Sequence, residues 1–499
     1  MKPATRFGLM HHPQKRSRIR IWVVTILFFC SVNTYLDRAC IASAVDAIRN
    51  DLQLSAEAMG LVLGVFALGY ALFQVPSGWF ADRYGAKKTL AFVVTAWSAL
   101  TALTGLVWRF WELIVVRFLF GASEAGAFPG IAQAYYRWLP PGERGLAHGV
   151  TFSGSRLGAA VSLFLMPWLI AQLGWRGMFL INGLVGLLWV TWWLLTYRDD
   201  PHDHPRVTAE ELHHIKASEV KTTDRVETAP LAVLITSRNM FLAMIQYFAS
   251  NVTFFVTLTW LPTYLKRQWS DDPSAIYWSA VPLLCATAAN WVAGGMVTRL
   301  HSLGFPVASR RITAMIGFGL GTVGLLFAAQ TESLIWFIVF FSITTFGVDM
   351  TLSPSWAFCN DLGGEHSGTI SAAMNMVGNI GAAFGAIVFP ILQDATTGRA
   401  EMFFLMAAAF NAVAIVCWLF MNPKRGLTST VATKRLWRRF VVLMVVLITL
   451  AAGVIGLQVY ISTQRHGADN KQEKTSVNTG QSDTKENLMP GTANLRTTN

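Results

Sequence analysis

The sequence predicts an all-α protein embedded in a membrane, and three observations support this prediction. Of the 499 residues, 53% are hydrophobic and only 14% are charged, whereas a soluble domain has about 25% charged residues. Apolar segments of about 18 to 25 residues recur along the chain, and each is long enough to cross a bilayer core of roughly 30 Å. Short basic runs separate these segments, as in multi-pass proteins, so nucleic-acid binding is the weaker explanation of the net charge of +12.

Twelve of the apolar segments form two groups of six. The polar stretch 198–238 separates an N-terminal half at 20–197 from a C-terminal half at 239–421, and we expect it to be a cytoplasmic linker with a short surface helix. Its four histidines fit a solvated linker better than a metal site. The predicted spans are 20–42, 58–80, 88–107, 110–137, 147–171, 176–197, 239–265, 277–299, 311–330, 333–358, 367–393 and 401–421.

Both ends of the chain lie outside this twelve-span unit. Lys and Arg are concentrated in 1–19, in the loops after the second and before the ninth span, and in the first part of 422–462. The positive-inside rule therefore places the N-terminus in the cytoplasm. The basic linker leads into a predicted thirteenth helix at 440–462, and the polar tail 463–499 should be disordered. If 440–462 spans the membrane, the tail is outside the cytoplasm; if it only packs on the bundle or the surface, the tail stays inside.

The loop after the second span carries the most specific motif, GWFADRYGAKK. It resembles the signature loop of the major facilitator superfamily, G-x-x-x-D-R-x-G-x-[RK]-x. The resemblance implies a major facilitator fold, with two six-helix halves built from inverted repeats. We interpret the loop as a latch, in which a glycine permits close helix approach and the acid caps or pairs at a neighbouring helix end, with Arg83 supplying the opposite charge. The matching residues are Gly78, Asp82, Arg83, Gly85 and Lys87.

Charged residues inside the predicted spans point to a transport site. Each charge at the bilayer centre costs at least about 2.5 kcal/mol, so these groups should face a water-filled cavity and pair with one another. Arg117 and Glu124 are two helical turns apart, on nearly the same face and about 10 Å apart along the axis. Asp37 and Arg38 are adjacent and point about 100° apart, so one can face the cavity and the other a neighbouring helix.

The segment NTYLDR in span one and the R-x6-E pattern in span four resemble the anion:cation symporter family. That family includes bacterial carriers of hexuronate, galactonate and glucarate, as well as sialin and the vesicular glutamate transporters. The resemblance implies that Asp37 and Glu124 couple protons and that Arg38 binds the substrate carboxylate. It also implies that Arg117 pairs with the acids, modulates their protonation and contributes to substrate binding. Tyr35 is expected to donate its hydroxyl to substrate.

The remaining candidates leave alternatives open. Arg156 could bind a second substrate carboxylate, pair with Glu124, or form a helix-packing ion pair. Asp349 in span ten could lie near a helix end or pair across the bundle, and we do not assign it to the site. Neutral hydrogen-bonding groups for the substrate are expected from span two and from the C-terminal half. These candidates are Tyr70, Gln74, Asn375, Asn379, Ser353 and Trp356, with Asn251 and Tyr264 as further possibilities.

The sequence thus predicts a carrier and not an enzyme, with no cofactor and no metal. We expect a proton-coupled symporter that imports a small organic anion by alternating access, namely a sugar acid such as a hexuronate, aldonate or aldarate. An importer of aromatic or dicarboxylic acids is the alternative among carriers, and a non-transporting membrane sensor is the alternative of another class. The expected partners are the anion, protons and the lipid bilayer of a bacterial inner membrane, and the family resemblance implies a monomer.

Overall fold

The computed structural model describes residues 18–216, 237–272, 274–395 and 400–423, and every regular element in these ranges is a helix. The predicted helix at 440–462 and the tail at 463–499 lie outside them. The helices of the first half and linker are α1 (Ile19–Ser43), α2 (Val45–Leu52), α3 (Ala56–Thr104), α4 (Phe110–Glu124), α5 (Ala127–Trp138), α6 (Pro141–Thr196), the short 3₁₀ helix η1 (Pro201–Asp203) and α7 (Ala209–Lys216).

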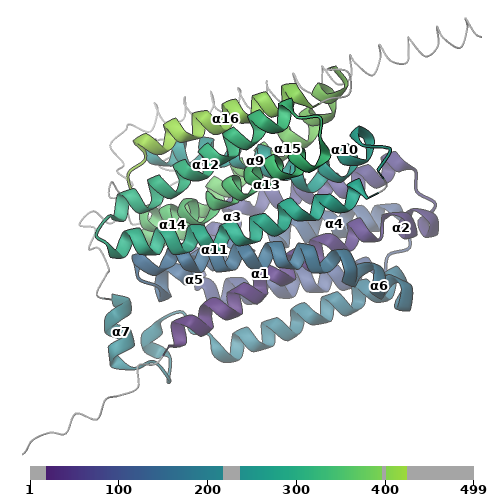
Figure 1. Cartoon of the computed structure of the whole chain (residues 1–499). Coiled ribbons are helices and arrows are strands. Elements are labelled where there is room, and N and C mark those ends of the chain that lie inside the picture. The colour runs from purple at the N-terminus through teal and green to yellow at the C-terminus, as the bar shows by residue number, and fades with distance from the viewer. Residues whose placement is uncertain (1–17, 217–236, 273, 396–399, 424–499) are drawn as a thin grey trace, which may run out of the picture. The chain divides into compact units, whose positions relative to one another are not determined.

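The second half continues the bundle. Its helices are α9 (Arg238–Thr259), α10 (Leu261–Gln268), η2 (Ala275–Ser279), α11 (Ala280–Ser302), α12 (Pro306–Gln330), α13 (Leu334–Met350), α14 (Leu352–Gly363), η3 (Gly364–His366), α15 (Ser367–Ala395) and α16 (Glu401–Phe420). Figure 1 shows the long helices running nearly parallel to one another, which is the arrangement of an α-helical membrane bundle.

Nine helical stretches of the described chain are long and apolar enough to cross a membrane. Three of them, of 47, 56 and 60 residues, are each long enough for two crossings, because one crossing needs about 20 residues. The predicted twelve crossings are therefore present. The two spans within α3 turn back at Gly85 (φ 84°) and those within α6 at Gly174 (φ 68°). Both backbones are left-handed, a conformation that glycine adopts without steric cost.

Three of the predicted spans are not continuous helices. The fourth is divided between α4 and α5, the seventh between α9 and α10, and the tenth between α13 and α14. Each break lies two to four residues before a proline, namely Pro129, Pro262 and Pro354. Proline lacks the amide hydrogen that would bond to the carbonyl four residues earlier, and its ring clashes with that carbonyl. These prolines therefore account for the difference from the predicted continuous spans.

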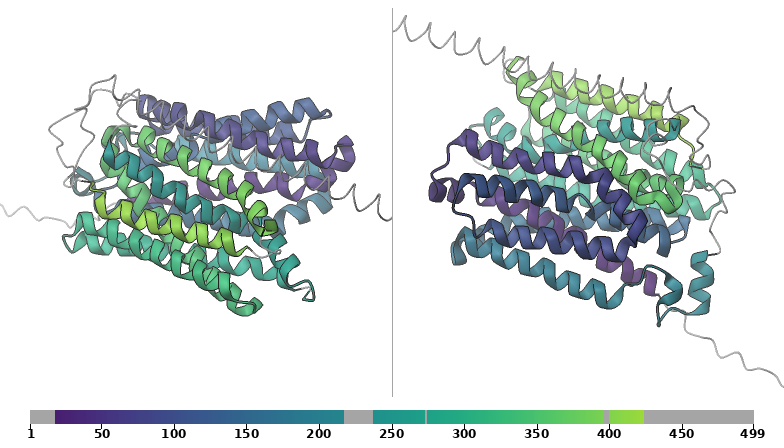
Figure 2. Two further views of the ribbon diagram at one scale, coloured as in Figure 1. Left: turned by 90° about the horizontal axis from the view of Figure 1, so that it is seen from above. Right: turned by 180° about the vertical axis from the view of Figure 1, so that it is seen from behind.

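The two halves lie side by side, as the colours in Figure 2 show. Within the first half, α1 packs on α6 and α3 turns back on itself and packs on α4; within the second, α9 packs on α15 and α12 on α13 and α16. The halves meet along α6 with α11 and along α3 with α15. The interface between the halves therefore runs through the centre of the bundle.

One end of the bundle, which we call the latch end, is closed by polar contacts between the halves. Arg144 at the start of α6 forms an ion pair of 3.0 Å with Asp361 of α14. Arg310 of α12 pairs with the same carboxylate at 2.9 Å within the second half, and donates across to the backbone carbonyl of Pro141 at 2.7 Å. Ser367 at the start of α15 donates to the side chain of Gln133 on α5 at 2.7 Å. At this end, therefore, the two halves are held together.

The linker helix α7 is fastened to the first half at the same end. Glu211 accepts hydrogen bonds from the backbone amides of Ile19 and Arg20, at 3.2 and 3.1 Å, and so caps the start of α1 from outside the helix. Glu143 on α6 accepts from Arg20 at 2.8 Å and contacts His214 of α7 at the same distance. The linker thus joins the first turns of α1 and α6.

Candidate functional site

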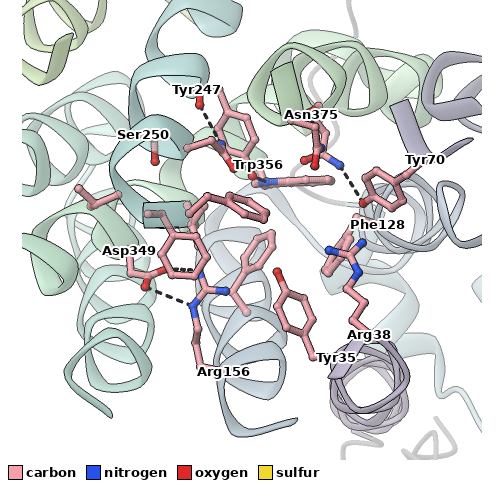
Figure 3. Close-up of a pocket in the computed structure, with 17 residues that line it drawn as sticks. Tyr35, Arg38, Tyr70, Phe128, Arg156, Tyr247, Ser250, Asp349, Trp356 and Asn375 are labelled. Atoms are coloured by element: carbon pink, nitrogen blue, oxygen red, sulfur yellow. Dashed lines mark hydrogen bonds and ion pairs between the residues drawn. The ribbon is translucent and has the colours of Figure 1, made fainter. Parts of the chain in front are cut away.

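A cavity lies between the halves at the centre of the bundle, and Figure 3 shows the side chains around it. Its aromatic lining consists of Tyr35, Tyr70, Phe128, Phe152, Tyr247, Phe254, Phe255 and Trp356. Its charged and polar lining consists of Arg38, Arg156, Asp349, Ser250, Asn251, Asn375 and Asn379. A concave, largely apolar site with a few convergent polar groups is typical of small-molecule binding.

Arg38 of α1 is the charged group on the side of the cavity formed by the first half. Its Nε donates to the carboxylate of Glu124 at 2.8 Å, and the guanidinium lies 4.6 Å from the ring centre of Tyr70. Glu124 is fully buried at the last residue of α4, just before the break that precedes Pro129. Glu124 does not line the cavity, so it contacts the site through Arg38.

Asp37 points away from the cavity. Its carboxylate accepts hydrogen bonds of 3.1 Å from the side chains of Asn33 on the same helix and Trp97 on α3. Arg38 therefore faces the cavity while Asp37 faces a neighbouring helix, as their adjacent positions on a helix permit. Within the described residues, Asp37 has no ion-pair partner.

Arg117 does not occupy the place that the sequence suggested. Its guanidinium is buried between the rings of Phe66 and Phe120, at 5.2 and 4.6 Å from their centres. Among the residues that the structure describes it forms no ion pair, and it does not line the cavity. The predicted ion pair with the acids is absent from the described residues, because Glu124 binds Arg38 instead and lies about 10 Å further along α4. Arg117 still interacts electrostatically with Asp37 and Glu124, so its influence on their protonation stays a prediction.

Arg156 and Asp349 form the second ion pair of the cavity. The guanidinium donates to the carboxylate at 3.2 Å from Nε and at 2.5 Å from Nη2, and both residues are buried. The alternative in which Arg156 pairs with Glu124 is wrong, because Arg38 already binds that acid. Arg156 belongs to α6 and Asp349 to α13, so this pair connects the two halves across the cavity (Figure 3).

Polar side chains of the second half complete the cavity wall. Asn375 of α15 donates to the hydroxyl of Tyr70 at 3.2 Å, which joins the halves on the other side of the site. Trp356 donates to the hydroxyl of Tyr247 at 2.9 Å. Asn379 lines the cavity and donates to the backbone carbonyl of Asn375. The amide oxygen of Asn379 can therefore accept a hydrogen bond from a ligand.

Three other predicted side chains lie outside the cavity. Ser353 donates to the backbone carbonyl of Gly145 at 2.6 Å, between α14 and α6. Gln74 is fully buried about 6 Å further along the helix than Tyr70. Tyr264 packs in a cluster of aromatic rings. Helical spacing predicts which face of a helix a residue occupies, but not whether it lies at the level of the cavity along the helix axis. The sequence therefore predicted more substrate-binding residues than the cavity contains.

The sequence did not identify much of the cavity. Tyr247, Ser250 and the lining phenylalanines were not predicted, and Asp349 was not assigned to the site. On a membrane-spanning helix, an aromatic side chain that lines a cavity has the same sequence signal as one that faces lipid. The spacing of Tyr247 and Asn251, one helical turn apart, was the single available signal.

The predicted latch lies at the latch end. Asp82 accepts hydrogen bonds from the backbone amides of Gly368 and Thr369, both at 2.8 Å, and from the Thr369 hydroxyl. The carboxylate therefore caps the N-terminus of α15, where the helix dipole favours a negative charge. A Cβ atom at position 78 would lie 2.6 Å from the Gly368 carbonyl oxygen, so Gly78 permits the close approach of α3 and α15.

The other latch residues have local roles. A Cβ atom at Gly85 would lie 2.6 Å from a carboxylate oxygen of Asp199, which accepts a hydrogen bond of 3.0 Å from the backbone amide of Lys87. Glycine therefore allows Asp199 to cap the helix that follows the turn. Arg83 is exposed and forms no ion pair within the described ranges, so it does not supply the opposite charge that we expected next to Asp82.

Comparison with known proteins identifies the family. Residues 27–386 match the family described as "Major Facilitator Superfamily". The "Probable sulfoacetate transporter SauU" of Cupriavidus necator is 30% identical over 82% of this chain and 95% of its own length. The "Probable L-galactonate transporter" of Escherichia coli is 27% identical over 84% and 93%, and the "Hexuronate transporter" of Bacillus subtilis is 27% identical over 82% and 96%.

Solved structures agree with the fold. The proton:xylose symporter XylE superposes with a TM-score of 0.64 at 14% identity, over 81% of this chain and 96% of that one. FucP in the outward conformation gives a TM-score of 0.60 at 12% identity, over 81% and 100%. The fold, the family match and the relatives lead to one conclusion: this chain belongs to the Major Facilitator Superfamily and is a multi-pass membrane transporter.

Proposed function

We propose that the protein is a proton-coupled symporter that imports a small organic anion, with a sugar acid such as a hexuronate, aldonate or aldarate as its substrate. The observation that carries the proposal is the 2.8 Å contact between Arg38, which lines the cavity, and the buried Glu124. The relatives' descriptions support it, because those quoted above name carriers of the organic anions sulfoacetate, L-galactonate and hexuronate.

The coupling mechanism follows from competition for Arg38. A substrate carboxylate that enters the cavity can take the guanidinium from Glu124. A buried carboxylate that loses its ion-pair partner becomes unstable as an ion, by about 3 to 5 kcal/mol. Protonation removes that penalty, so binding of the anion drives uptake of a proton. Asp37, the neighbour of Arg38 on α1, accepts a hydrogen bond from Trp97, and we propose that it carries the same proton or a second one.

The relation between the halves supports alternating access. Asp82, Arg144 and Ser367 hold the halves together at the latch end, so a substrate would leave through this end only after these contacts break. We propose that the latch end and the N-terminus face the cytoplasm of a bacterial cell and that the protein resides in the inner membrane. One chain lines the whole cavity, and we propose that a monomer transports.

Transport by purified protein in liposomes tests the proposal. Under an inward proton gradient, the wild type should accumulate a radiolabelled sugar acid, whereas Glu124→Gln and Asp37→Asn should lose accumulation and retain counterflow exchange. Asp51→Asn is the matched control, because Asp51 pairs with Arg176 outside the cavity. Full accumulation by both variants would refute the coupling scheme. Absence of counterflow for every organic anion would favour a sensor.

An importer of aromatic acids is the second candidate, and the aromatic lining favours it. Three of the lining rings, Phe128, Phe152 and Trp356, pack on one another, with ring centres 5.4 to 5.8 Å apart. Offset or edge-on packing of a ligand ring against such a wall is worth about 0.5 to 1.5 kcal/mol per pair. Counterflow of phthalate or benzoate in preference to all sugar acids would select this candidate.

A further inference from the structure

Two arginine–acid pairs meet in one cavity, and the proposed coupling uses one of them. Arg38 binds Glu124 through Nε, and Arg156 binds Asp349 through Nε and Nη2. A guanidinium has five N–H donors in a planar fork, so each arginine keeps donors that its acid does not engage. Arg38 Nη2 is buried and has no hydrogen-bonding partner among the described residues. Arg38 therefore keeps a donor for a ligand, and Asp349 leaves the Nη1 group of Arg156 unengaged.

The two arginines are close enough for one small molecule to reach both. Tyr35 lies between them (Figure 3), and their guanidinium carbons are 5.1 and 5.9 Å from the centre of its ring. Adding these two distances gives an upper limit of 11.0 Å for the separation of the guanidinium carbons. A carboxylate paired with a guanidinium places its carbon roughly 4 Å from the guanidinium carbon. Two anionic groups separated by a short carbon chain therefore fit between the arginines.

The charges of the lining favour an anionic ligand, and each of the two arginines can take one anionic group. Arg38 and Arg156 are cationic, and Asp349 is the one acid among the residues that line the cavity. A substrate with one carboxylate would satisfy Arg38 and leave the outer donors of Arg156 without an anionic partner. The neutral hydroxyl of Tyr35 hydrogen-bonds to Arg156, and a hydrogen bond to an ionised group is roughly twice as strong as a neutral one. A second anionic group would therefore give Arg156 a stronger partner.

We infer that the preferred substrate is a small organic dianion, with one anionic group on Arg38 and the other on Arg156, and that Asp349 is a positioning residue. Asp349 holds the Nε edge of Arg156 and so turns the opposite edge toward the ligand. This inference rests on the proposed function and narrows it to dicarboxylates, aldarates and molecules with a sulfonate and a carboxylate.

Binding of matched ligand pairs to the purified full-length protein tests the inference. Galactarate and galactonate differ in one terminal carboxylate, and so do phthalate and benzoate; sulfoacetate and acetate differ in one sulfonate. Titration calorimetry should give at least tenfold tighter binding of the dianion in at least one pair. Equal or tighter binding of the monoanion in every pair would overturn the inference. Transport of a monoanion alone would overturn it while leaving the proposed function intact.

Variants of Arg156 and Asp349 test whether this ion pair causes the preference for a dianion over a monoanion. Arg156→Gln combined with Asp349→Asn removes the ion pair without changing the net charge, and should weaken dianion binding at least tenfold and monoanion binding less than twofold. The control Arg176→Gln with Asp51→Asn removes an ion pair outside the cavity and should change neither. If the first double variant does not fold, Arg156→Lys keeps the charge but loses the fork, and should still reduce the dianion preference severalfold. Equal losses for both ligand classes would contradict the assignment.

Discussion

The latch makes a quantitative prediction for the balance between the two transport states. Asp82→Asn keeps the shape of the cap on α15 but removes its charge and one of two acceptor oxygens. Three donors of Gly368 and Thr369 then share one oxygen. Loss of the charge at a partly buried helix N-terminus costs up to about 2 kcal/mol. In the open state the side chain is hydrated, so this cost applies only to the closed latch.

A change of about 2 kcal/mol corresponds to a shift of about 30-fold toward the open latch, since each 1.4 kcal/mol is tenfold. Ser367 is fully buried at the latch end, so Ser367→Cys in a cysteine-free background reports opening through its rate of labelling by a maleimide. Asp82→Asn should accelerate labelling by that factor. Thr369→Val removes one donor and keeps the charge, so it should give a smaller acceleration of about fivefold. Asp203→Asn, at an exposed linker position, is the neutral control.

The outcome that would refute this reasoning is a labelling rate for Asp82→Asn within twofold of the parent. The Asp82→Asn variant should bind substrate as tightly as the parent, because Asp82 does not line the cavity. A parallel loss of binding and faster labelling of every buried cysteine would indicate unfolding and not opening.

Three further perturbations follow from contacts described above. Gly85→Ala forces a left-handed alanine against Asp199, which should lower the free energy of unfolding by about 1 to 3 kcal/mol; an unchanged Tm would contradict this. Trp97→Phe removes a donor to Asp37 and should reduce proton-driven accumulation about tenfold with little effect on counterflow, whereas equal losses in both assays would assign Trp97 a purely structural role. Glu211→Gln removes the charge that caps the start of α1, so hydrogen exchange there should accelerate about fivefold, as expected for about 1 kcal/mol; unchanged protection would show that the linker contact is not stabilising.

The fold was predictable because a bilayer imposes a length on every span and a charge bias on every loop. The signature loop then identified the superfamily. The breaks were less predictable, although Pro129, Pro262 and Pro354 are visible in the sequence. A proline in a membrane helix produces either a kink or a complete break, and neighbouring helices, which the sequence does not describe, decide between them.

The site was predictable only in part, for a geometric reason. Helical periodicity gives the direction of a side chain about its own helix axis, and this placed Arg38 and Tyr70 correctly. It does not say which helix lies opposite or at what depth, so Arg117 and Gln74 were assigned to a cavity that they do not line. The pair of Arg156 and Asp349 joins residues 193 positions apart, and no local pattern connects them.

Helix α6 contacts the second half at several depths, so a rotation of this helix moves its contacts by different distances. Arg144 pairs near its first turn and Arg156 pairs beside the cavity, about 18 Å further along the axis. If the inner pair serves as the pivot, a tilt of about 10° displaces the outer pair by about 3 Å, which is enough to break a hydrogen bond of ordinary length. The inner pair barely moves during that tilt. The outer pair therefore provides the resistance to the tilt, and a small rotation beside the cavity becomes a larger displacement at the distant end.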